Sequence, residues 1–349
     1  MGTSARRKIR FFKPEDCVKA SKSRLKTSLQ GPKPLKVRYG LSNWPDYNQA
    51  LIQRGSLHLW LDEQTLQTWY HTGPRKPGGV YRYSDACIEC ALRIKYVLGL
   101  AFRQTQGLLA SLIKAMKLDL QIPSYSQLCR RQVRLVQRLP PEQELPLDRQ
   151  AAYVVVDSTG LKVYGEGEWK VRQHGASQRR TWRKVHLACD EATNQVLAIA
   201  LTGNEVDDAS MLKPLLDELT QPVGRVGADG AYDRVKVYDY LRQRQIQPVI
   251  PPRANAIVWT DKQGQPVVHA RNQAVLAIEE VGLATWKQQV EYHRRSKAEI
   301  GMYRLKITFG ERLQSRRLTS QKVEVRIKAA CLNRFCGLGM PNAVKKTQT

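Results

Sequence analysis

The sequence has no apolar run near the roughly 18 residues that a membrane-spanning helix needs, so we expect no transmembrane segment. Its N-terminus is basic but has no apolar core segment, which argues against a signal peptide. Cysteine is scarce, with seven scattered residues in a chain of 349. An odd, dispersed set of this kind predicts reduced thiols and a cytoplasmic location instead of a disulfide framework.

Cys87 and Cys90 form the single close cysteine pair that could suggest a metal or redox site. A zinc site would need two further ligands at suitable spacing, and the sequence offers none nearby. The flanking residues, ACIECALRIKYVLGL, are mostly apolar and indicate a helix. We therefore expect packed core cysteines, with metal or redox use as the alternative.

Acidic residues are few: 31 Asp and Glu stand against 57 Lys and Arg, which gives a net charge of +26. Such an excess indicates a polyanionic partner. Nucleic acid is the first candidate, because each cation that neutralises a phosphate releases condensed counterions. An anionic membrane surface is the alternative partner. A basic chain can also serve general solubility, but that role usually gives a much smaller excess of positive charge.

Changes in composition divide the chain into five segments. Residues 1–38 carry twelve Lys or Arg and two acids, which predicts a flexible basic arm. Residues 39–138 form a mainly helical region, and the proline-rich residues 139–150 indicate a linker. Residues 151–312 alternate between strand and helix patterns. Residues 313–349 are expected to form a basic C-terminal helix and tail.

Within the helical region, a second helix after a short loop carries the DNA-binding prediction. Ser124 and Gln127 have the spacing of a capping box and follow a proline, so a helix should start there. Arg130, Arg134 and Arg138 recur every four residues, which places them on one face. Two helices with a basic second helix indicate a helix-turn-helix-like DNA reader, although a basic face is also common on solvated helices. The candidate DNA contacts are Arg130, Arg131 and Arg134.

The segment from residue 151 predicts a mixed α/β fold with helices flanking a sheet. The apolar run Tyr153–Val156 is typical of a central strand buried on both faces. Residues 182–201 read as a hairpin with its turn at Glu191–Gln195. Further strands and helices alternate, and a long helix is expected from about Asn272 to near Lys306.

Two aspartates stand at equivalent places in this pattern. Asp157 follows the apolar run, and Asp229 follows the short strand of GRVGADGAYD. Functional side chains in α/β sheets gather at the carboxyl ends of strands, so the two carboxylates are expected to converge. Their repulsion would raise one pKa unless a hard cation such as Mg²⁺ intervened. The alternative is that each aspartate caps the turn that follows it.

The long helix carries one glutamate among many basic residues. Tyr292, Arg295, Glu299 and Lys306 would lie within an arc of about 60° at about 100° per residue. One stripe would then carry a hydroxyl, a guanidinium, a carboxylate and an ammonium. Basic neighbours outside that arc would serve only the general attraction to DNA: Arg294, Lys297 and Arg304.

The spacing Y-x₂-R-x₃-E-x₆-K, matched from Tyr292 to Lys306, resembles the signature of bacterial insertion-sequence transposases of the DDE type, insertion sequence family five. DSTGLKVYGEGEW around Asp157 and GADGAYD around Asp229 resemble the other blocks of that family, as do two helical segments before them. The resemblance runs from about Tyr39 to Phe335, in the family's order.

The resemblance implies a ribonuclease-H-like catalytic domain that cleaves and joins DNA. Asp157, Asp229 and Glu299 would bind two Mg²⁺ ions, with Mn²⁺ as a substitute. The partners implied are the terminal inverted repeats, target DNA and further copies of the chain, with no membrane and no small-molecule substrate. Tyr292, Arg295 and Lys306 would contact phosphates near the transposon end.

Three weaker expectations concern polar residues near these blocks. Lys162 follows the first aspartate and is a candidate DNA contact. His186 alternates with apolar residues, which favours a buried structural histidine. Asp207 and Asp208 precede a helix, so helix capping is favoured over metal binding. The rival functions are a catalytically dead DNA-binding regulator and a plain nuclease of the same fold.

Overall fold

The computed structural model describes residues 38–74, 81–135, 151–163 and 182–346. The chain divides into two compact units, one made of its two ends and one spanning Pro45–Met340. The expected linker at 139–150 and all but the last residue of the expected arm at 1–38 lie outside the described residues.

The first unit contains a two-stranded antiparallel sheet. Strand β1 (Arg38–Leu41) pairs with β7 (Ala343–Lys346), so segments from opposite ends of the sequence lie side by side. The backbone N–H of Ser42 donates to the Asn342 carbonyl at 2.9 Å and extends the pairing by one step. Arg38, placed in the arm by its charge, is therefore the first residue of a strand.

The second unit begins with short helices. These are α2 (Trp44–Gln53), η1 (Leu57–Leu59), α3 (Glu63–Gln67), α4 (Asp85–Val97), α5 (Phe102–Ala115) and α6 (Tyr125–Gln132). The expected capping box is confirmed, because the Gln127 side chain accepts from the Ser124 N–H at 2.9 Å and Ser124 caps the helix in return. The expected packing of the cysteine pair is also confirmed, since Cys87 and Cys90 are buried on α4.

Helix α6 is shorter than its arginine spacing predicts. It ends at Gln132, so Arg134 lies beyond the helix, and Arg138 lies outside the described residues. The prediction that one helical face carries both Arg130 and Arg134 is therefore wrong. The backbone leaves the helix where Arg134 N–H bonds back to the Arg131 carbonyl in a tight turn.

A five-stranded mixed sheet follows, in the order β4-β3-β2-β5-β6. Its strands are β2 (Ala152–Lys162), β3 (Trp182–Asp190), β4 (Val196–Thr202), β5 (Val223–Gly227) and β6 (Gln247–Val249). The expected β3–β4 hairpin is confirmed. The pairs β2–β3 and β3–β4 are antiparallel, and β2–β5 and β5–β6 are parallel.

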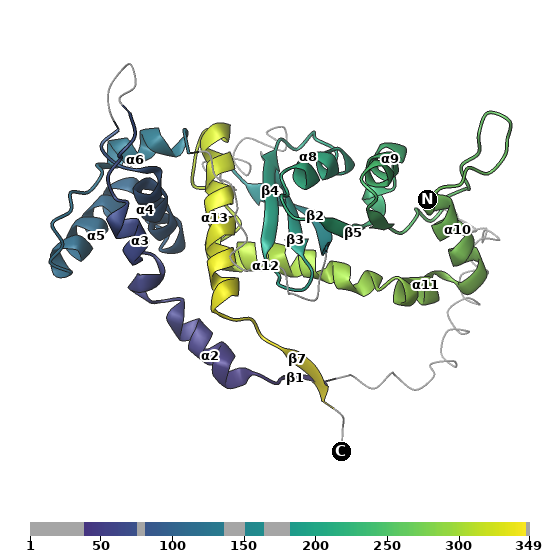
Figure 1. Ribbon diagram of the computed structural model, residues 1–349, viewed down its shortest axis with the longest axis horizontal. Coiled ribbons are helices and arrows are strands. Elements are labelled where there is room, and N and C mark those ends of the chain that lie inside the picture. The colour runs from purple at the N-terminus through teal and green to yellow at the C-terminus, as the bar shows by residue number, and fades with distance from the viewer. Residues whose placement is uncertain (1–37, 75–80, 136–150, 164–181, 347–349) are drawn as a thin grey trace, which may run out of the picture. The chain divides into compact units, whose positions relative to one another are not determined.

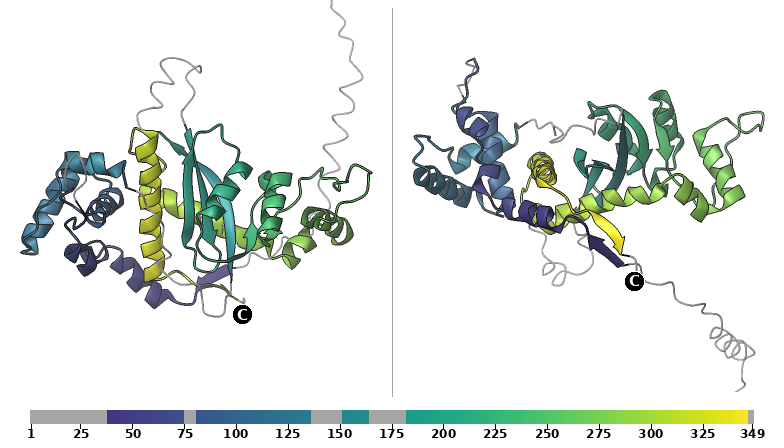
Figure 2. Two further views of the ribbon diagram at one scale, coloured as in Figure 1. Left: turned by 45° about the horizontal axis from the view of Figure 1, so that its top comes forward. Right: turned by 60° about the horizontal axis from the view of Figure 1, so that its bottom comes forward.

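Helices cover both faces of this sheet, as Figures 1 and 2 show. Alternate residues of β2 enter different cores: Val155 packs with α12 (Ser296–Phe309) and α13 (Leu318–Leu338), and Val154 packs with α8 (Leu212–Asp217) and α9 (Val235–Gln243). The central strand is thus buried on both faces, as its continuous apolar run predicts. The result is a mixed sheet flanked by helices.

The core on the α12–α13 side does not stop at the sheet. The same cluster of buried side chains includes Trp69, Ile88 and Leu128 from the helical region and Ile327 and Leu332 from α13. The helical region and the sheet therefore share one core through α13.

A buried ion pair on α13 joins this core to the segment before the helix. Lys328 Nζ lies 2.7 Å from Glu324 Oε1, and both side chains are fully buried. The two oxygens of Glu324 also accept from the backbone N–H groups of Gln314 (2.9 Å) and Ser315 (2.8 Å). One carboxylate thus balances a buried cation and fixes a loop.

The long helix expected from Asn272 is interrupted. The structure has α10 (Ala270–Val281), α11 (Leu283–Gln289), the 3₁₀ turn η4 (Tyr292–Arg295) and then α12. Gly282 has φ +82°, and Glu291 has φ +55°, in the left-handed region that ends a helix. None of the described helices is both long and apolar enough to span a membrane.

Candidate active site beside β2 and β5

Asp157 and Asp229 occupy equivalent positions on neighbouring strands. The parallel register pairs Val155 with Gly227, and each aspartate lies two residues further along its chain. Neighbouring strands are about 4.8 Å apart, and residues two apart share a face, so the two side chains are brought together. The sequence suggested that Asp157 lies at the end of its strand. This is wrong, because β2 stays paired with β3 as far as Lys162.

Both aspartates also bond to nearby backbone, as the capping alternative expects. Asp157 accepts from the Ser158 N–H at 2.8 Å, and Asp229 accepts from the Ala231 N–H at 2.9 Å. In each case the bond uses Oδ1 of the carboxylate. Capping and a further role are therefore compatible at both positions.

The electrostatics of Asp157 connect the three acids. Burial raises the pKa of Asp157, and the charges of Asp229 and Glu299 raise it further, while the Ser158 N–H and Arg295 act in the opposite direction. The third acid, Glu299, comes from the first turn of α12, with its side chain 55% exposed. Strand β2, the turn after β5 and the helix α12 thus each supply one acid, and the charges of Asp229 and Glu299 act on Asp157.

Arg295 stands between two of these acids. Its Nη1 lies 3.3 Å from Asp157 Oδ2, and its Nη2 pairs with Glu299 Oε1. The Arg295 guanidinium lies over the Tyr292 ring, with its central carbon 5.8 Å from the ring centroid. Desolvation lowers the pKa of Arg295, but Tyr292 and the acids together raise it above its usual value. Three members of the predicted stripe are therefore brought together, with Tyr292 and Arg295 on η4 instead of α12.

The turn that carries Tyr292 is anchored to β5 by residues that sequence reasoning missed. Arg225 donates to the Val290 carbonyl at 2.8 Å and to Glu291 Oε2 at 3.1 Å. Its guanidinium thereby holds the left-handed residue Glu291 against the strand that leads to Asp229. The glycine-free left-handed turn gave no signal in the sequence.

Two basic residues outside the stripe serve the fold. Arg294 pairs with Glu191 at 3.2 Å and with Glu291 at 2.8 Å. Arg304 donates to the carbonyls of Asn194 and Leu332. Local partners hold both guanidinium groups, and the expected role of these residues in the general attraction to DNA stays a prediction.

Comparison with known proteins identifies the chain. A family model described as Transposase DDE domain matches residues 149–334, just over half of the chain, and a second model of the same description matches residues 52–166. The chain belongs to the DDE-domain transposases. Among solved structures, it is similar to a chain of the piggyBac transposase synaptic complex with hairpin DNA, at 12% identity and a TM-score of 0.36. That likeness covers 86% of this chain and 77% of the other.

The carboxylates of the transposase are chemically suitable ligands for a metal ion, but their positions in this structure do not form a metal site. DDE transposases generally use divalent metal ions, and hard cations prefer carboxylate oxygens. Among the described residues, however, no three His, Cys, Asp or Glu side chains are placed to hold a metal. Arg295 occupies the space between Asp157 and Glu299. The Glu299 side chain is 55% exposed, so it has room to turn without disturbing the core.

Glu299 is held over the sheet by a close approach of α12 to β3. A side chain at Gly301 would bring its Cβ to 2.9 Å from Cys189 Sγ and 3.2 Å from Leu187 Cδ2. Glycine costs helix stability, but here it lets the helix lie against the strand. The position of Glu299 in the transposase therefore depends on Gly301.

We expect Gly301→Ala to lower stability by up to about 2 kcal/mol, because overpacking costs about 1–3 kcal/mol and is offset by a gain in helix propensity of only about 1 kcal/mol. Denaturant unfolding of Gly301→Ala, Cys189→Ala and the double variant would measure this. The substitution at Gly301 should cost less in the Cys189→Ala background, which removes the nearest atom. An equal cost in both backgrounds would show that contact with Cys189 is unimportant.

The other candidate DNA contacts have different surroundings. Arg130 is exposed on α6. Arg131 is buried and bonds to Asp85 and to the Tyr83 carbonyl, so its guanidinium faces protein in the transposase. Arg134 donates to the Tyr81 hydroxyl at 2.7 Å. Lys162 lies 3.7 Å from Glu311 at the end of β2, and Lys306 is half-buried near the end of α12.

A second polar cluster adjoins the carboxylates. His186 is buried, as expected, and its Nε2 lies 2.8 Å from the Thr202 hydroxyl. The sequence suggested that Asp208 caps a helix. Its side chain makes no capping hydrogen bond and instead lies 3.1 Å from Lys184 Nζ. The buried Tyr232 hydroxyl has no hydrogen-bond partner among the described residues, and burial followed by the charges of Asp208 and Asp157 raises its pKa.

Proposed function

We propose that this transposase belongs to the insertion sequence family five type, binds the terminal inverted repeats of its own element, cuts the DNA there and joins the end to target DNA. The observation that carries the proposal is the placement of the three acids. Asp157 and Asp229 each lie two residues beyond the paired residues Val155 and Gly227, and Arg295 bridges Asp157 to Glu299 of α12. A DNA-binding regulator would have no need of this arrangement.

The topology supports a ribonuclease-H-like catalytic domain. Three antiparallel strands, β4, β3 and β2, are followed across the sheet by the parallel strands β5 and β6. The central strand of that order carries the first acid, and its parallel neighbour leads to the second. We propose this domain as the catalytic one, with the preceding helical region as the DNA-binding part.

In the proposed site, Asp157, Asp229 and Glu299 hold two Mg²⁺ ions, for which Mn²⁺ can substitute. The metals would activate the attacking oxygen and stabilise the leaving oxygen of the phosphodiester. Arg295 would leave the acids and bind a phosphate through its planar fork, beside Tyr292. Lys306 would add a single positive charge along the same helix. The proposed assembly is a dimer or larger oligomer that pairs two DNA ends.

The test is to incubate the full chain with duplexes that carry the inverted repeats flanking its own gene, in Mg²⁺ or in EDTA. We expect a free 3′-OH at the repeat ends and its joining to a second duplex, in Mg²⁺ alone. Cleavage without preference for the repeats would indicate a plain nuclease. Tight binding to the repeats without any cleavage would indicate a regulator.

A further inference from the structure

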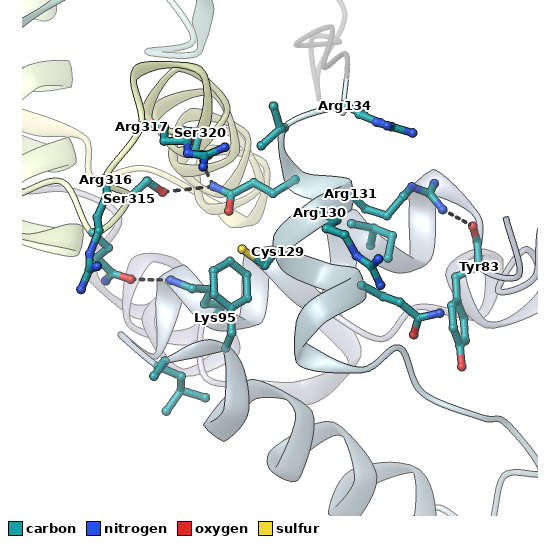
Figure 3. Close-up of a pocket in the computed structure, with 18 of the residues that line it drawn as sticks. Tyr83, Lys95, Cys129, Arg130, Arg131, Arg134, Ser315, Arg316, Arg317 and Ser320 are labelled. Atoms are coloured by element: carbon teal, nitrogen blue, oxygen red, sulfur yellow. Dashed lines mark hydrogen bonds between the residues drawn. The ribbon is translucent and has the colours of Figure 1, made fainter. Parts of the chain in front are cut away.

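A basic cleft lies apart from the carboxylate site, between α4–α6 and the residues that precede α13. It has a volume of about 1190 Å³ and is lined by arginines and a lysine, with no acidic side chain. Figure 3 shows Arg316 and Arg317 on one side and Arg130, Arg131 and Arg134 on the other. The two walls come from segments about 180 residues apart in the sequence.

The cations of the cleft divide into those that are held by partners within the protein and those without an acidic partner. Arg131 is held by Asp85, and Lys95, which is buried, donates to Gln314 Oε1 at 2.7 Å. Four others are exposed and have no acidic partner within the part of the chain that the structure describes: Arg82, Arg130, Arg316 and Arg317. The cleft therefore presents positive charge that the protein itself does not neutralise.

This charge is held in place by the fold. Glu324 fixes the backbone of Gln314 and Ser315 from below. From the α6 side, Gln132 Nε2 donates to Ser315 Oγ and to the Ser320 carbonyl, each at 3.2 Å. The loop that bears Arg316 and Arg317 is thus tied to both helices. Like charges confined in this way favour a polyanion in the cleft.

The cleft is connected by the chain to the carboxylate site. Asp157 lies five residues before the end of β2 at Lys162, about 16 Å at 3.3 Å per residue. There Leu313 N–H bonds to the Lys162 carbonyl at 2.9 Å, and the chain leads from Leu313 into the Arg316 loop. A long, continuous polyanion could therefore contact both places, whereas a small anion would reach few of these cations.

We propose that this composite cleft binds the sugar-phosphate backbone of the duplex whose end lies at the carboxylates. The proposal rests on the proposed function and adds to it a DNA contact formed jointly by α6 and the residues before α13. Contacts of this kind position the DNA without reading its sequence. Arg316 and Arg317 are phosphate contacts, and Glu324 is a positioning residue that holds their loop.

The salt dependence of DNA binding tests the proposal. Each phosphate contact contributes about 0.9 to the slope of log K against log salt, so Arg316→Ala/Arg317→Ala should reduce the slope by about 2. The loss of affinity should be equal for repeat-end and unrelated duplexes. The matched control, Lys236→Ala/Arg242→Ala, removes two exposed charges from α9 and should leave the slope unchanged. Equal slopes for the two double variants would overturn the proposal.

Cys129 offers a second measurement that needs no arginine variant. It lines the cleft and is exposed, while the other described cysteines are buried. In a Cys17→Ser background, duplex at ten times its Kd should slow alkylation of Cys129 about tenfold. Unchanged alkylation would contradict the cleft as a DNA site. Equal protection by a nucleoside triphosphate would make it a small-anion site and overturn the proposal.

These outcomes separate the cleft from the proposed function. Cleavage of repeat ends together with a wild-type salt slope in the Arg316/Arg317 variant would reject the cleft and leave the transposition proposal intact. A reduced slope and protection of Cys129, without any cleavage, would retain the cleft and reject the catalytic proposal.

Discussion

Replacing Glu299 with Gln will abolish cleavage and strand transfer while leaving binding to DNA ends intact. Glutamine keeps the shape and removes the charge, so a metal would lose one carboxylate ligand. Metal stabilisation is worth several kcal/mol, which corresponds to a loss of about a thousandfold or more in rate. Binding should not fall, because Glu299 contributes a negative charge that repels phosphates.

The measurement is single-turnover cleavage of a repeat-end duplex in Mg²⁺, with affinity determined in parallel. Asp157→Asn and Asp229→Asn should behave in the same way. Glu280→Gln, an exposed glutamate on α10, is the matched control and should cut at the wild-type rate. Normal cleavage by Glu299→Gln would remove this residue from the catalytic site.

Replacing Glu324 with Ala will destabilise the protein by about 3–5 kcal/mol, the cost of breaking a buried ion pair. Lys328 would remain fully buried without its counterion, and the Gln314 and Ser315 N–H groups would lose their acceptor. Denaturant unfolding measures the change. The loss should exceed that of any exposed pair in the protein.

Asp239→Ala is the control for this prediction, since the Asp239–Arg242 pair on α9 is exposed and should contribute no more than about 1 kcal/mol. The double variant Glu324→Ala/Lys328→Met should recover only part of the loss, because the two backbone donors stay unpaired. A cost below that of Asp239→Ala would mean that the buried pair does not stabilise the fold.

The parts of the fold that follow from local pattern could be predicted from sequence. The β3–β4 hairpin, the two-faced burial of β2 and the Ser124 cap each depend on residues close together in the chain. The candidate aspartates could be identified from sequence for the same reason, since Asp157 and Asp229 follow recognisable apolar runs. Glu299 was found through a short motif whose spacing survives the break between η4 and α12.

What could not be predicted depends on distant partners. Helix α6 ends at Gln132 with a turn closed onto the Arg131 carbonyl, and the Arg131 side chain pairs with Asp85 on α4. The left-handed residue Glu291 is held by Arg225 from another strand. Strand β2 extends past Asp157 because β3 supplies a pairing partner. No local signal in the sequence specifies these contacts.

The shared core limits how this protein can be modified as a set of modules. The match to the second family model begins at residue 149 and overlaps the first over residues 149–166, which suggests a place near residue 150 to exchange the preceding helical part for that of another transposase. The hydrophobic core does not divide at residue 150, because α13 packs against α4 of the helical region as well as β4 of the sheet. A chimera joined at residue 150 would pair mismatched surfaces, so retargeting this protein to new DNA ends requires α13 to be transplanted together with residues 45–135.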